Sequence, residues 1–159
     1  MKRLKIYLDS SVLGCALSRE DVARYNTANI LLQQISQGIL EGYISAITQK
    51  EIEEAPEWIR ELLEEVVSHA GLKVIEGVPE DMAQELAQEY IRMGIIPENF
   101  VEDALHIAIA SLSGMDALVS FNLRHIVRLE VMIGVNKVNR RKGVKGIFLC
   151  QPMEVIQDV

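Results

Sequence analysis

Short apolar runs typical of strands alternate with longer segments of helical periodicity along nearly the whole of this 159-residue chain. Residues 4–8 (LKIYL) alternate apolar and polar side chains and are rich in β-formers, which predicts a first strand. Further short strands are predicted at 40–47, 72–76, 117–121 and 147–150. Repeated β/α alternation is typical of a parallel sheet with helices on both faces. We therefore expect an α/β fold with three layers, α/β/α, around a mostly parallel central sheet.

Helices are predicted between these strands from apolar spacing and from residues that begin or end helices. Apolar residues at helical spacing run from Glu20 to Gln37, and Gly38 is a natural stop. Pro56 suits the first position of a helix, because its fixed φ and missing N–H are tolerated there. The other predicted helices cover 48–55, 56–69, 79–93, 100–113 and 122–139.

The length suits one domain, which we assign to residues 1–159, and its composition of 49% hydrophobic and 25% charged residues is that of an ordinary soluble globular protein. Cys15 and Cys150 lie far apart in apolar surroundings. We expect both to be small buried hydrophobes in a reducing compartment.

No apolar stretch of about 18 residues occurs, and the N-terminal run is too short for a signal peptide. The expected location is the cytoplasm, with no membrane segment.

Charge is unevenly distributed along the chain. The formal net charge of −7 argues against a protein that binds nucleic acid through a broad basic surface. Acidic residues crowd the segment 51–65, and basic residues crowd a segment near the C-terminus. This basic cluster is a weak indication of phosphate contact, because charge runs usually form a solvated face. It comprises Lys137, Arg140, Arg141, Lys142 and Lys145.

Two acidic residues and one amide follow predicted strands, at the sheet edge where open α/β proteins bind ligands. Asp9 comes directly after the first strand, Glu51 a turn after the second, and Asn122 directly after the fourth. Each also has a purely structural explanation. Asp9 and Asn122 are good helix caps, and Glu51 fits a capping box with Thr48.

Asp103 is the most informative single residue of the sequence. It shares a helix face with Ile107 and Ala110 by i, i+4, i+7 spacing, so it continues an apolar stripe toward the sheet. The neighbouring Glu102 can complement the helix dipole from the solvent side. An inward Asp is costly unless it is paired or bound to metal. Asp116 precedes the fourth strand, so we expect it in a loop at the opposite edge.

Three carboxylates and an amide at one edge of a sheet would repel each other in an empty site. Such a cluster either raises some of its pKa values or holds a hard cation. Ligation by oxygen alone suits Mg²⁺ or Mn²⁺ and not zinc. A site of this kind activates water and orients a phosphodiester for in-line attack. The predicted metal and catalytic residues are Asp9, Glu51, Asp103 and Asn122.

Two histidines near these positions are candidate bases. His106 lies one turn past Asp103, and we expect it to have a backbone or solvent partner on its helix. His125 lies near Asn122, with Arg124 beside it as a candidate phosphate contact. The cluster of four oxygen ligands explains the chemistry without them.

The sequence resembles the PIN-domain family, and within it the VapC-type toxin-like ribonucleases. The resemblance rests on YLDSSVL (7–13), SAITQKEIEE (45–54) and DALHIAIASLSGMDALVSFNLRHI (103–126), in that order and spacing. With a final segment like IFLCQPMEVI (147–156), it covers essentially the whole chain. It implies a PIN-like fold, a parallel sheet between helices, and metal-dependent endoribonuclease activity on RNA.

On this resemblance Asp9, Glu51 and Asp103 match the three acidic metal-site positions of the family. Ser10 matches the small hydroxyl residue after the first Asp, and Ser120 matches the hydroxyl residue before the fourth position. That fourth position is often Asp in the family and is Asn122 here. The loss of one negative charge is expected to weaken the binding of a second metal ion.

The leading hypothesis is therefore a Mg²⁺- or Mn²⁺-dependent endoribonuclease that hydrolyses RNA phosphodiester bonds, the toxin of a toxin–antitoxin pair. The resemblance implies a small antitoxin partner and a homodimer. Candidate contacts to the RNA backbone are Arg124, Lys137, Arg140 and Arg141.

Two alternatives stay open from the sequence. The first is a catalytically weak PIN-fold module that binds RNA or a protein partner, which Asn122 and the acidic balance motivate. The second is a small hydrolase with Asp9 as a phosphoryl-accepting nucleophile. For that second alternative, Ser11 stands where haloacid-dehalogenase-like enzymes usually carry a second Asp.

Overall fold

The computed structural model describes residues 2–158, and these residues form one five-stranded sheet of order β3–β2–β1–β4–β5. All neighbouring strands pair in parallel, which confirms the predicted α/β class and parallel sheet. All five strands expected from the sequence are present, and each is shorter than predicted. They are β1 (Lys5–Leu8), β2 (Glu41–Ile44), β3 (Lys73–Val74), β4 (Ala117–Val119) and β5 (Phe148–Cys150).

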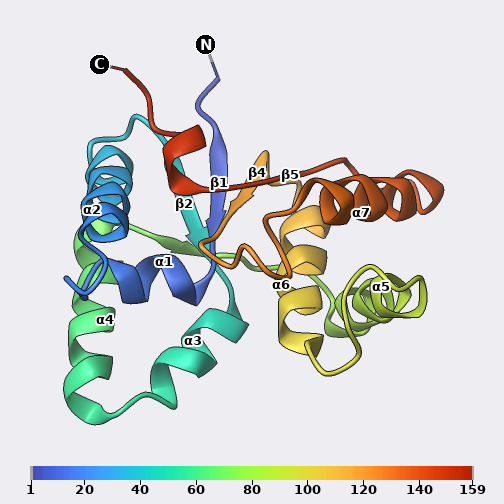
Figure 1. Cartoon of the computed structure of the whole chain (residues 1–159), viewed down its shortest axis with the longest axis horizontal. Helices are drawn as coiled ribbons and strands as arrows, with labels where there is room; N and C mark the ends of the chain where they lie inside the picture. The colour runs from blue at the N-terminus through green and yellow to red at the C-terminus, as the bar shows by residue number, and fades with distance from the viewer. Residues whose placement is uncertain (1, 159) are drawn as a thin grey trace.

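Helices cover the sheet on both faces, as the three-layer prediction requires (Figure 1). Within residues 2–158, no helix has both the length and the apolar character needed to cross a bilayer. One group is α1 (Ser10–Cys15), α2 (Val22–Ser36), α3 (Ala46–Glu53) and α4 (Glu57–Ala70). The other is α5 (Glu80–Arg92), α6 (Val101–Leu112) and α7 (Leu129–Arg141), and a 3-10 turn, Pro152–Glu154, follows β5.

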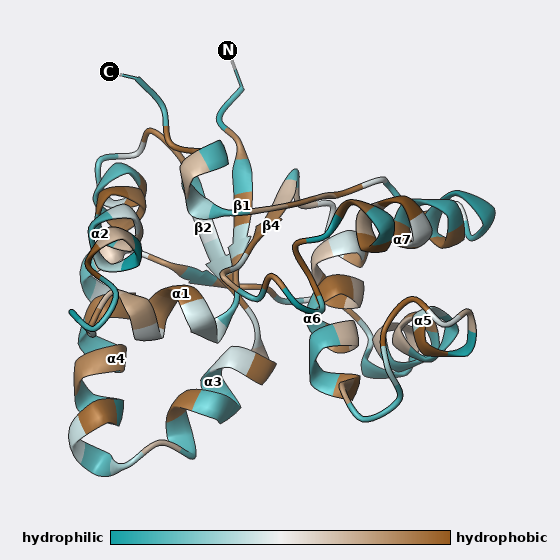
Figure 2. Ribbon diagram, in the orientation of Figure 1, coloured by the Kyte–Doolittle hydropathy of each residue, from teal (hydrophilic) through white to brown (hydrophobic). Residues whose placement is uncertain are grey.

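The central strand β1 sends its side chains alternately into two hydrophobic cores. Ile6 and Leu8 join the core with α1, α2 and α4, whereas Tyr7 joins the core with α5, α6 and α7. All three side chains are fully buried. A strand buried on both faces needs a nearly continuous apolar sequence, which explains the run at the N-terminus. Figure 2 shows hydrophobic stretches on the helices of both groups, as helices with one buried face require.

Helix α3 begins earlier than the sequence predicted. Ser45 is its N-cap, with extended backbone (φ −126°, ψ 176°), and its Oγ accepts a hydrogen bond from the Ile47 N–H at 3.2 Å. Thr48 lies fully buried inside the helix, and its Oγ1 has no hydrogen-bond partner. The predicted capping box of Thr48 and Glu51 is therefore wrong. Ser45 caps instead because it directly follows β2, where the extended strand becomes a helix.

The predicted helix over 122–139 is correct only in its second part. Residues 122–128 form turns, and α7 begins at Leu129 after Arg128, whose backbone is extended (φ −142°, ψ 139°). Asn122 Oδ1 accepts a hydrogen bond from the His125 N–H at 3.0 Å. This bond from a side chain to the backbone offers the chain an alternative to helical pairing. The segment consequently leaves the sheet as a loop.

The chain changes winding direction at β1. Strands β2 and β3 lie on one side of β1, and β4 and β5 lie on the other, so the carboxyl ends of β1 and β4 meet at the topological switch point. Leu8 pairs with Val119 at the end of these strands. The next residues, Asp9 and Ser120, therefore leave the sheet side by side.

Candidate active site

Asp9 directly follows β1 at the switch point beside the end of β4, and it is only 5% exposed. We name this place, with Asp9, Glu51 and Asp103 around it, the carboxylate crevice. Ser11 Oγ donates to its Oδ1 at 2.6 Å, and Ser120 Oγ donates to its Oδ2 at 2.5 Å. Burial raises the pKa of Asp9, and the two hydroxyl hydrogen bonds oppose that shift. Asp9 occupies the N-cap position of α1, yet its side chain makes no capping hydrogen bond. The structure therefore does not support the explanation of Asp9 as a helix cap.

The two serines tie Asp9 to the loop that follows β4. The Phe121 N–H donates to Ser11 Oγ at 3.0 Å, and the Asn122 N–H donates to Ser120 Oγ at 2.8 Å. Ser120 is fully buried and stands where the resemblance implied a hydroxyl group. Ser11 was not recognised from the sequence as a site residue. Its signal was the second hydroxyl in the stretch DSS, directly after the strand.

Glu51 reaches the same edge from α3, and both of its carboxylate oxygens accept hydrogen bonds. His106 Nε2 lies 2.8 Å from Oε1, and Ser10 Oγ donates to Oε2. Burial alone would raise the pKa of Glu51, but these hydrogen bonds outweigh it and hold the pKa below its usual range. Ser10, expected from the resemblance beside the first Asp, thus contacts Glu51.

His106 differs from the sequence expectation of a backbone or solvent partner. It is 3% exposed, and its Nδ1 lies 2.5 Å from the Tyr7 hydroxyl while its Nε2 faces Glu51. The Tyr7 hydroxyl also lies 2.7 Å from Ser45 Oγ. These hydrogen-bonded side chains connect the core with α5, α6 and α7 to the carboxylate of Glu51. They come from β1, α6, α3 and the end of β2, so no local sequence pattern reveals them.

Asp103 lies half-buried in the first turn of α6, and the predicted face with Ile107 and Ala110 is confirmed, since both are fully buried. Asn122 Nδ2 donates to Asp103 Oδ2 at 3.3 Å. Burial raises the pKa of Asp103, and the nearby charge of Asp9 raises it further. The amide of Asn122 thus contacts Asp103 through its nitrogen, while its oxygen accepts from the His125 N–H.

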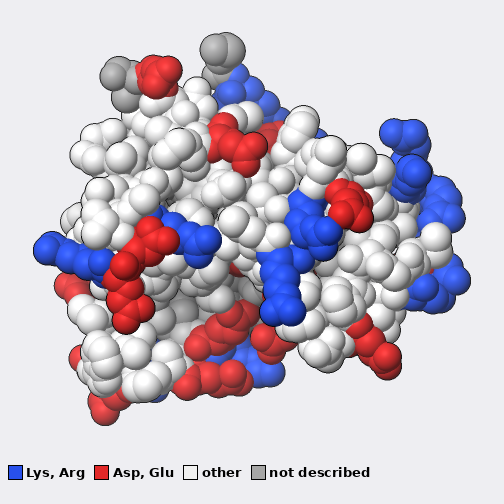
Figure 3. Space-filling view, in the orientation of Figure 1, with Lys and Arg blue, Asp and Glu red and all other residues white. Residues whose placement is uncertain are grey.

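The basic cluster does not join this site. Helix α7 runs from the loop after β4 back to the opposite edge of the sheet, and its last turn holds Arg140 and Arg141. Beyond it, Lys145 Nζ lies 3.0 Å from Asp116 Oδ1, and Asp116 Oδ2 accepts from the Lys5 N–H at the start of β1. This confirms the predicted place of Asp116. Figure 3 shows basic side chains gathered over the far end of α7. The structure therefore separates Lys137, Arg140 and Arg141 from the carboxylates.

Acidic side chains gather in a hollowed part of the surface over α3 and the adjoining end of α6 (Figure 3). None of the ion pairs formed within residues 2–158 includes Asp9 or Asp103. Glu51 pairs only with His106 in that part of the chain. The negative charge at the crevice is therefore not neutralised by Lys or Arg.

The donor set of Asp9, Glu51 and Asp103 fits a hard divalent cation, because all three offer carboxylate oxygens. As the side chains lie, residues 2–158 contain no group of three or more His, Cys, Asp or Glu placed to hold one metal ion. Glu51 is held by His106 and Ser10, and Asp9 is held by two serines. The donor chemistry of these three carboxylates thus fits Mg²⁺ or Mn²⁺.

These features define an α/β protein of PIN-like fold with a carboxylate crevice at its topological switch point. The chain is similar to a chain in the crystal structure of VapBC2 from Rickettsia felis bound to a DNA fragment from their promoter. The TM-score is 0.54 at 16% sequence identity, and the alignment covers 92% of this chain and 97% of that chain. No protein-family model and no curated protein matches the sequence. This likeness confirms the PIN-like fold that the sequence resemblance implied.

Proposed function

We propose that this protein is a metal-dependent endoribonuclease that hydrolyses phosphodiester bonds of RNA. The observation that supports the proposal is that Asp9, Glu51 and Asp103, from three separate elements, all lie within electrostatic reach of one buried histidine, His106. Burial raises the pKa of Asp9 and Asp103, and no Lys or Arg within residues 2–158 pairs with either. Buried carboxylates without cationic partners reduce stability. A site that binds a cation for catalysis accounts for this arrangement.

Each residue has a distinct role in the proposed reaction. Asp9, Glu51 and Asp103 would hold Mg²⁺ or Mn²⁺, which when bound supplies Lewis-acid stabilisation of phosphate charge and a more acidic water. Asn122 orients the Asp103 carboxylate through the hydrogen bond from its Nδ2. Ser11 and Ser120 fix the Asp9 carboxylate at the crevice, which limits its freedom before substrate binds.

The likeness to a chain of VapBC2 supports a toxin of the VapC type with an antitoxin protein as partner. The cytoplasm is the proposed location. A homodimer is part of the same proposal. The sequence alternative of a phosphoryl-accepting Asp9 has less support, because Ser11 stands where enzymes of that kind usually carry a second Asp.

The test combines Mn²⁺ titration by calorimetry with cleavage of RNA by purified protein. We expect Asp103→Asn to lose Mn²⁺ binding and cleavage, and chelation to stop cleavage by the wild type. Glu102→Gln is the matched control, because Glu102 is the adjacent acid and lies exposed on α6. Its binding and cleavage are expected to equal those of the wild type.

Cleavage that survives in Asp103→Asn would refute the proposed role of the carboxylates. A wild type that binds RNA but neither binds Mn²⁺ nor cleaves would instead establish the binding-module alternative.

A further inference from the structure

Two cavities of similar size include residues that belong to the candidate site or are hydrogen-bonded to it. The first, which we name the α5–α7 cavity, has a volume of about 740 Å³ and is lined by residues 91, 92, 94–98, 124, 125, 128, 130 and 131. The second, the α1–α4 cavity, has a volume of about 670 Å³ and is lined from α1, α3 and α4, with Ser10 and Glu51 at its edge. Substrate that reaches the crevice can extend into either one.

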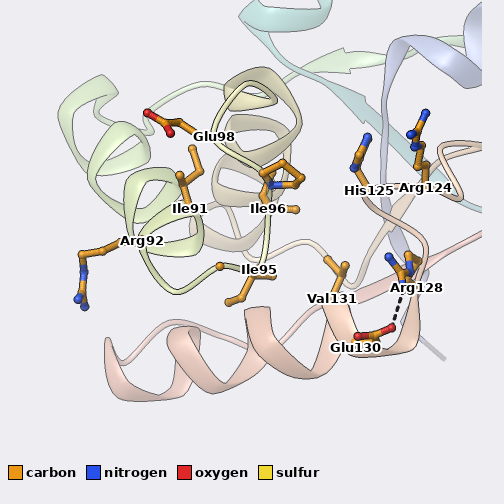
Figure 4. A pocket seen from close by; sticks show the side chains of 12 residues that line it. Ile91, Arg92, Ile95, Ile96, Glu98, Arg124, His125, Arg128, Glu130 and Val131 are labelled. Atoms are coloured by element: carbon orange, nitrogen blue, oxygen red, sulfur yellow. Dashed lines mark hydrogen bonds and ion pairs between the residues drawn. The ribbon is translucent and has the colours of Figure 1, made fainter.

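The two cavities differ in chemistry. Apolar side chains such as Leu13, Trp58 and Leu62 dominate the α1–α4 cavity, and Arg19 is its one lining cation within residues 2–158. The lining of the α5–α7 cavity instead combines an apolar floor with several cationic side chains and two acids, Glu98 and Glu130. Figure 4 shows Ile91, Ile95 and Ile96 on one side of this cavity, and His125 and Arg124 next to each other on the other.

Arg124 is the lining cation that is free to bind an anion. Arg128 Nη2 lies 2.5 Å from Glu130 Oε1, and Arg92 pairs with Glu89 on α5. Arg124 is exposed and takes part in no side-chain hydrogen bond or ion pair within residues 2–158. A phosphate can therefore contact Arg124 without first breaking an internal ion pair.

His125 connects the α5–α7 cavity to the carboxylates. Its ring stacks on Phe100 with centroids 3.9 Å apart and planes inclined by 29°. Its backbone N–H donates to Asn122, and Asn122 donates to Asp103. The flat imidazole is thus held beside the crevice by a stacked ring and an anchored backbone. His125 is the residue of the cavity lining that is hydrogen-bonded to the candidate site, through Asn122.

We propose that the α5–α7 cavity binds the nucleotide next to the scissile phosphate of single-stranded RNA. The base packs against His125 and the floor formed by the half-buried Ile91 and Ile95, and the phosphate on its far side contacts Arg124. This inference rests on the proposed function, because the crevice defines which phosphate is cleaved. It names a recognition subsite on one side of the cleaved bond.

Single-stranded RNA is the class that fits these groups. Its bases are free to turn out of the strand and stack on flat side chains, whereas the bases of a duplex are already paired. A chain of net charge −7 has little general attraction for RNA, so local contacts have to supply the affinity. The cavity offers both kinds of contact that such binding uses, a stacking surface and a free cation.

The first experiment measures the binding of a fluorescent single-stranded RNA of mixed sequence in EDTA, so that binding is read without metal or cleavage. We expect Arg124→Gln to raise the dissociation constant about three- to fivefold and to lower the salt slope by about 0.7, the value for one lost contact to single-stranded phosphate. Arg19→Gln in the α1–α4 cavity is the matched control and is expected to change neither value.

The second experiment asks whether the base is contacted. His125→Ala keeps the backbone N–H that donates to Asn122 Oδ1 but removes the flat ring. We expect its RNA affinity to fall roughly fivefold or more. The same RNA with abasic residues is expected to bind the wild type more weakly, yet to bind His125→Ala with little further loss. His125→Gln, a polar replacement without the ring, is expected to behave like His125→Ala.

The outcomes separate this inference from the proposed function. If Arg19→Gln weakens binding and Arg124→Gln does not, the RNA lies in the α1–α4 cavity and the inference is wrong. It is also wrong if wild-type binding is absent, or if abasic RNA binds as tightly as the intact strand. Binding with the expected pattern by a protein that never cleaves RNA would leave the subsite standing and refute only the nuclease.

Discussion

His106 Nε2 lies 2.8 Å from Glu51 Oε1, and this contact links an otherwise buried histidine to the carboxylate edge. The other ring nitrogen faces the Tyr7 hydroxyl. Burial raises the pKa of Tyr7, so that its hydroxyl stays protonated and can donate to His106 Nδ1. Because the lowered pKa of Glu51 keeps its carboxylate ionised, Glu51 accepts this hydrogen bond and His106 Nε2 is its donor. Tyr7, which belongs to the core with α5, α6 and α7, thus helps through His106 to orient Glu51, a candidate metal ligand.

Replacing His106 is expected to weaken metal binding without abolishing the fold. His106→Leu leaves Glu51 with only the Ser10 hydrogen bond, so we expect the Mn²⁺ affinity to fall about tenfold, the lower end for loss of a group that orients a ligand. His106→Gln keeps an N–H near the position of Nε2 and is expected to lose less. Calorimetric titration of both variants checks this, and equal affinities in His106→Leu and the wild type would contradict it.

The pH dependence of stability follows from the raised pKa of Asp103. Because burial raises the pKa of Asp103, this carboxyl stays protonated to a higher pH in the folded protein than in the unfolded chain. Stability of the metal-free protein therefore falls as pH rises from the ordinary Asp value through the raised one. Asp103→Asn removes this effect, so we expect the variant to be more stable than the wild type at pH 7 without metal.

Urea unfolding of both proteins at several pH values measures this difference. The advantage of Asp103→Asn is expected to shrink on acidification toward the ordinary Asp pKa, and to reverse at pH 7 when Mn²⁺ is added to the wild type. If Asp103→Asn is more stable than the wild type by the same free energy at every pH, the charge of the Asp103 carboxylate is not the source of the difference.

Tyr90 anchors a buried polar network remote from the crevice. Its hydroxyl donates to Asn139 Oδ1 at 2.5 Å, and Asn139 Nδ2 donates to Ser111 Oγ at 3.1 Å. Tyr90→Phe leaves a buried acceptor unsatisfied and is expected to cost about 1–3 kcal/mol of unfolding free energy. Tyr25→Phe is the matched control, because the Tyr25 hydroxyl has no hydrogen-bond partner within residues 2–158. Chemical denaturation compares the two.

Gly42 in β2 has no room for a larger residue. A Cβ there would lie 2.6 Å from Leu72 Cδ2 and 2.8 Å from Ile35 Cδ1, both in the core beneath α2. Gly42→Ala is therefore expected to lower the unfolding free energy by about 1–3 kcal/mol through overpacking. Gly14→Ala in α1 meets no atom within 4 Å and is expected to be neutral or slightly stabilising. Thermal unfolding distinguishes them, and equal melting temperatures would contradict the predicted clash.

Much of the candidate site could be predicted because its residues stand at recognisable places in local patterns. Asp9 and Asn122 directly follow short apolar runs, and Asp103 continues an apolar helical stripe. Ser11 was missed because a hydroxyl in a turn usually serves its own backbone. The start of α3 was misplaced because both Ser45 and Thr48 can cap a helix.

The sequence by itself determined which segments form strands and helices, because short-range periodicity decides this. Their alternation along the chain determined the parallel sheet and the edge at which the acidic residues lie. Only the tertiary structure decided the partners of His106, which lie 99 and 55 residues away in Tyr7 and Glu51. It also decided that the basic end of α7 lies at the edge opposite the carboxylates. Contacts between residues so distant in the chain depend on how whole elements pack, and no local pattern encodes that packing.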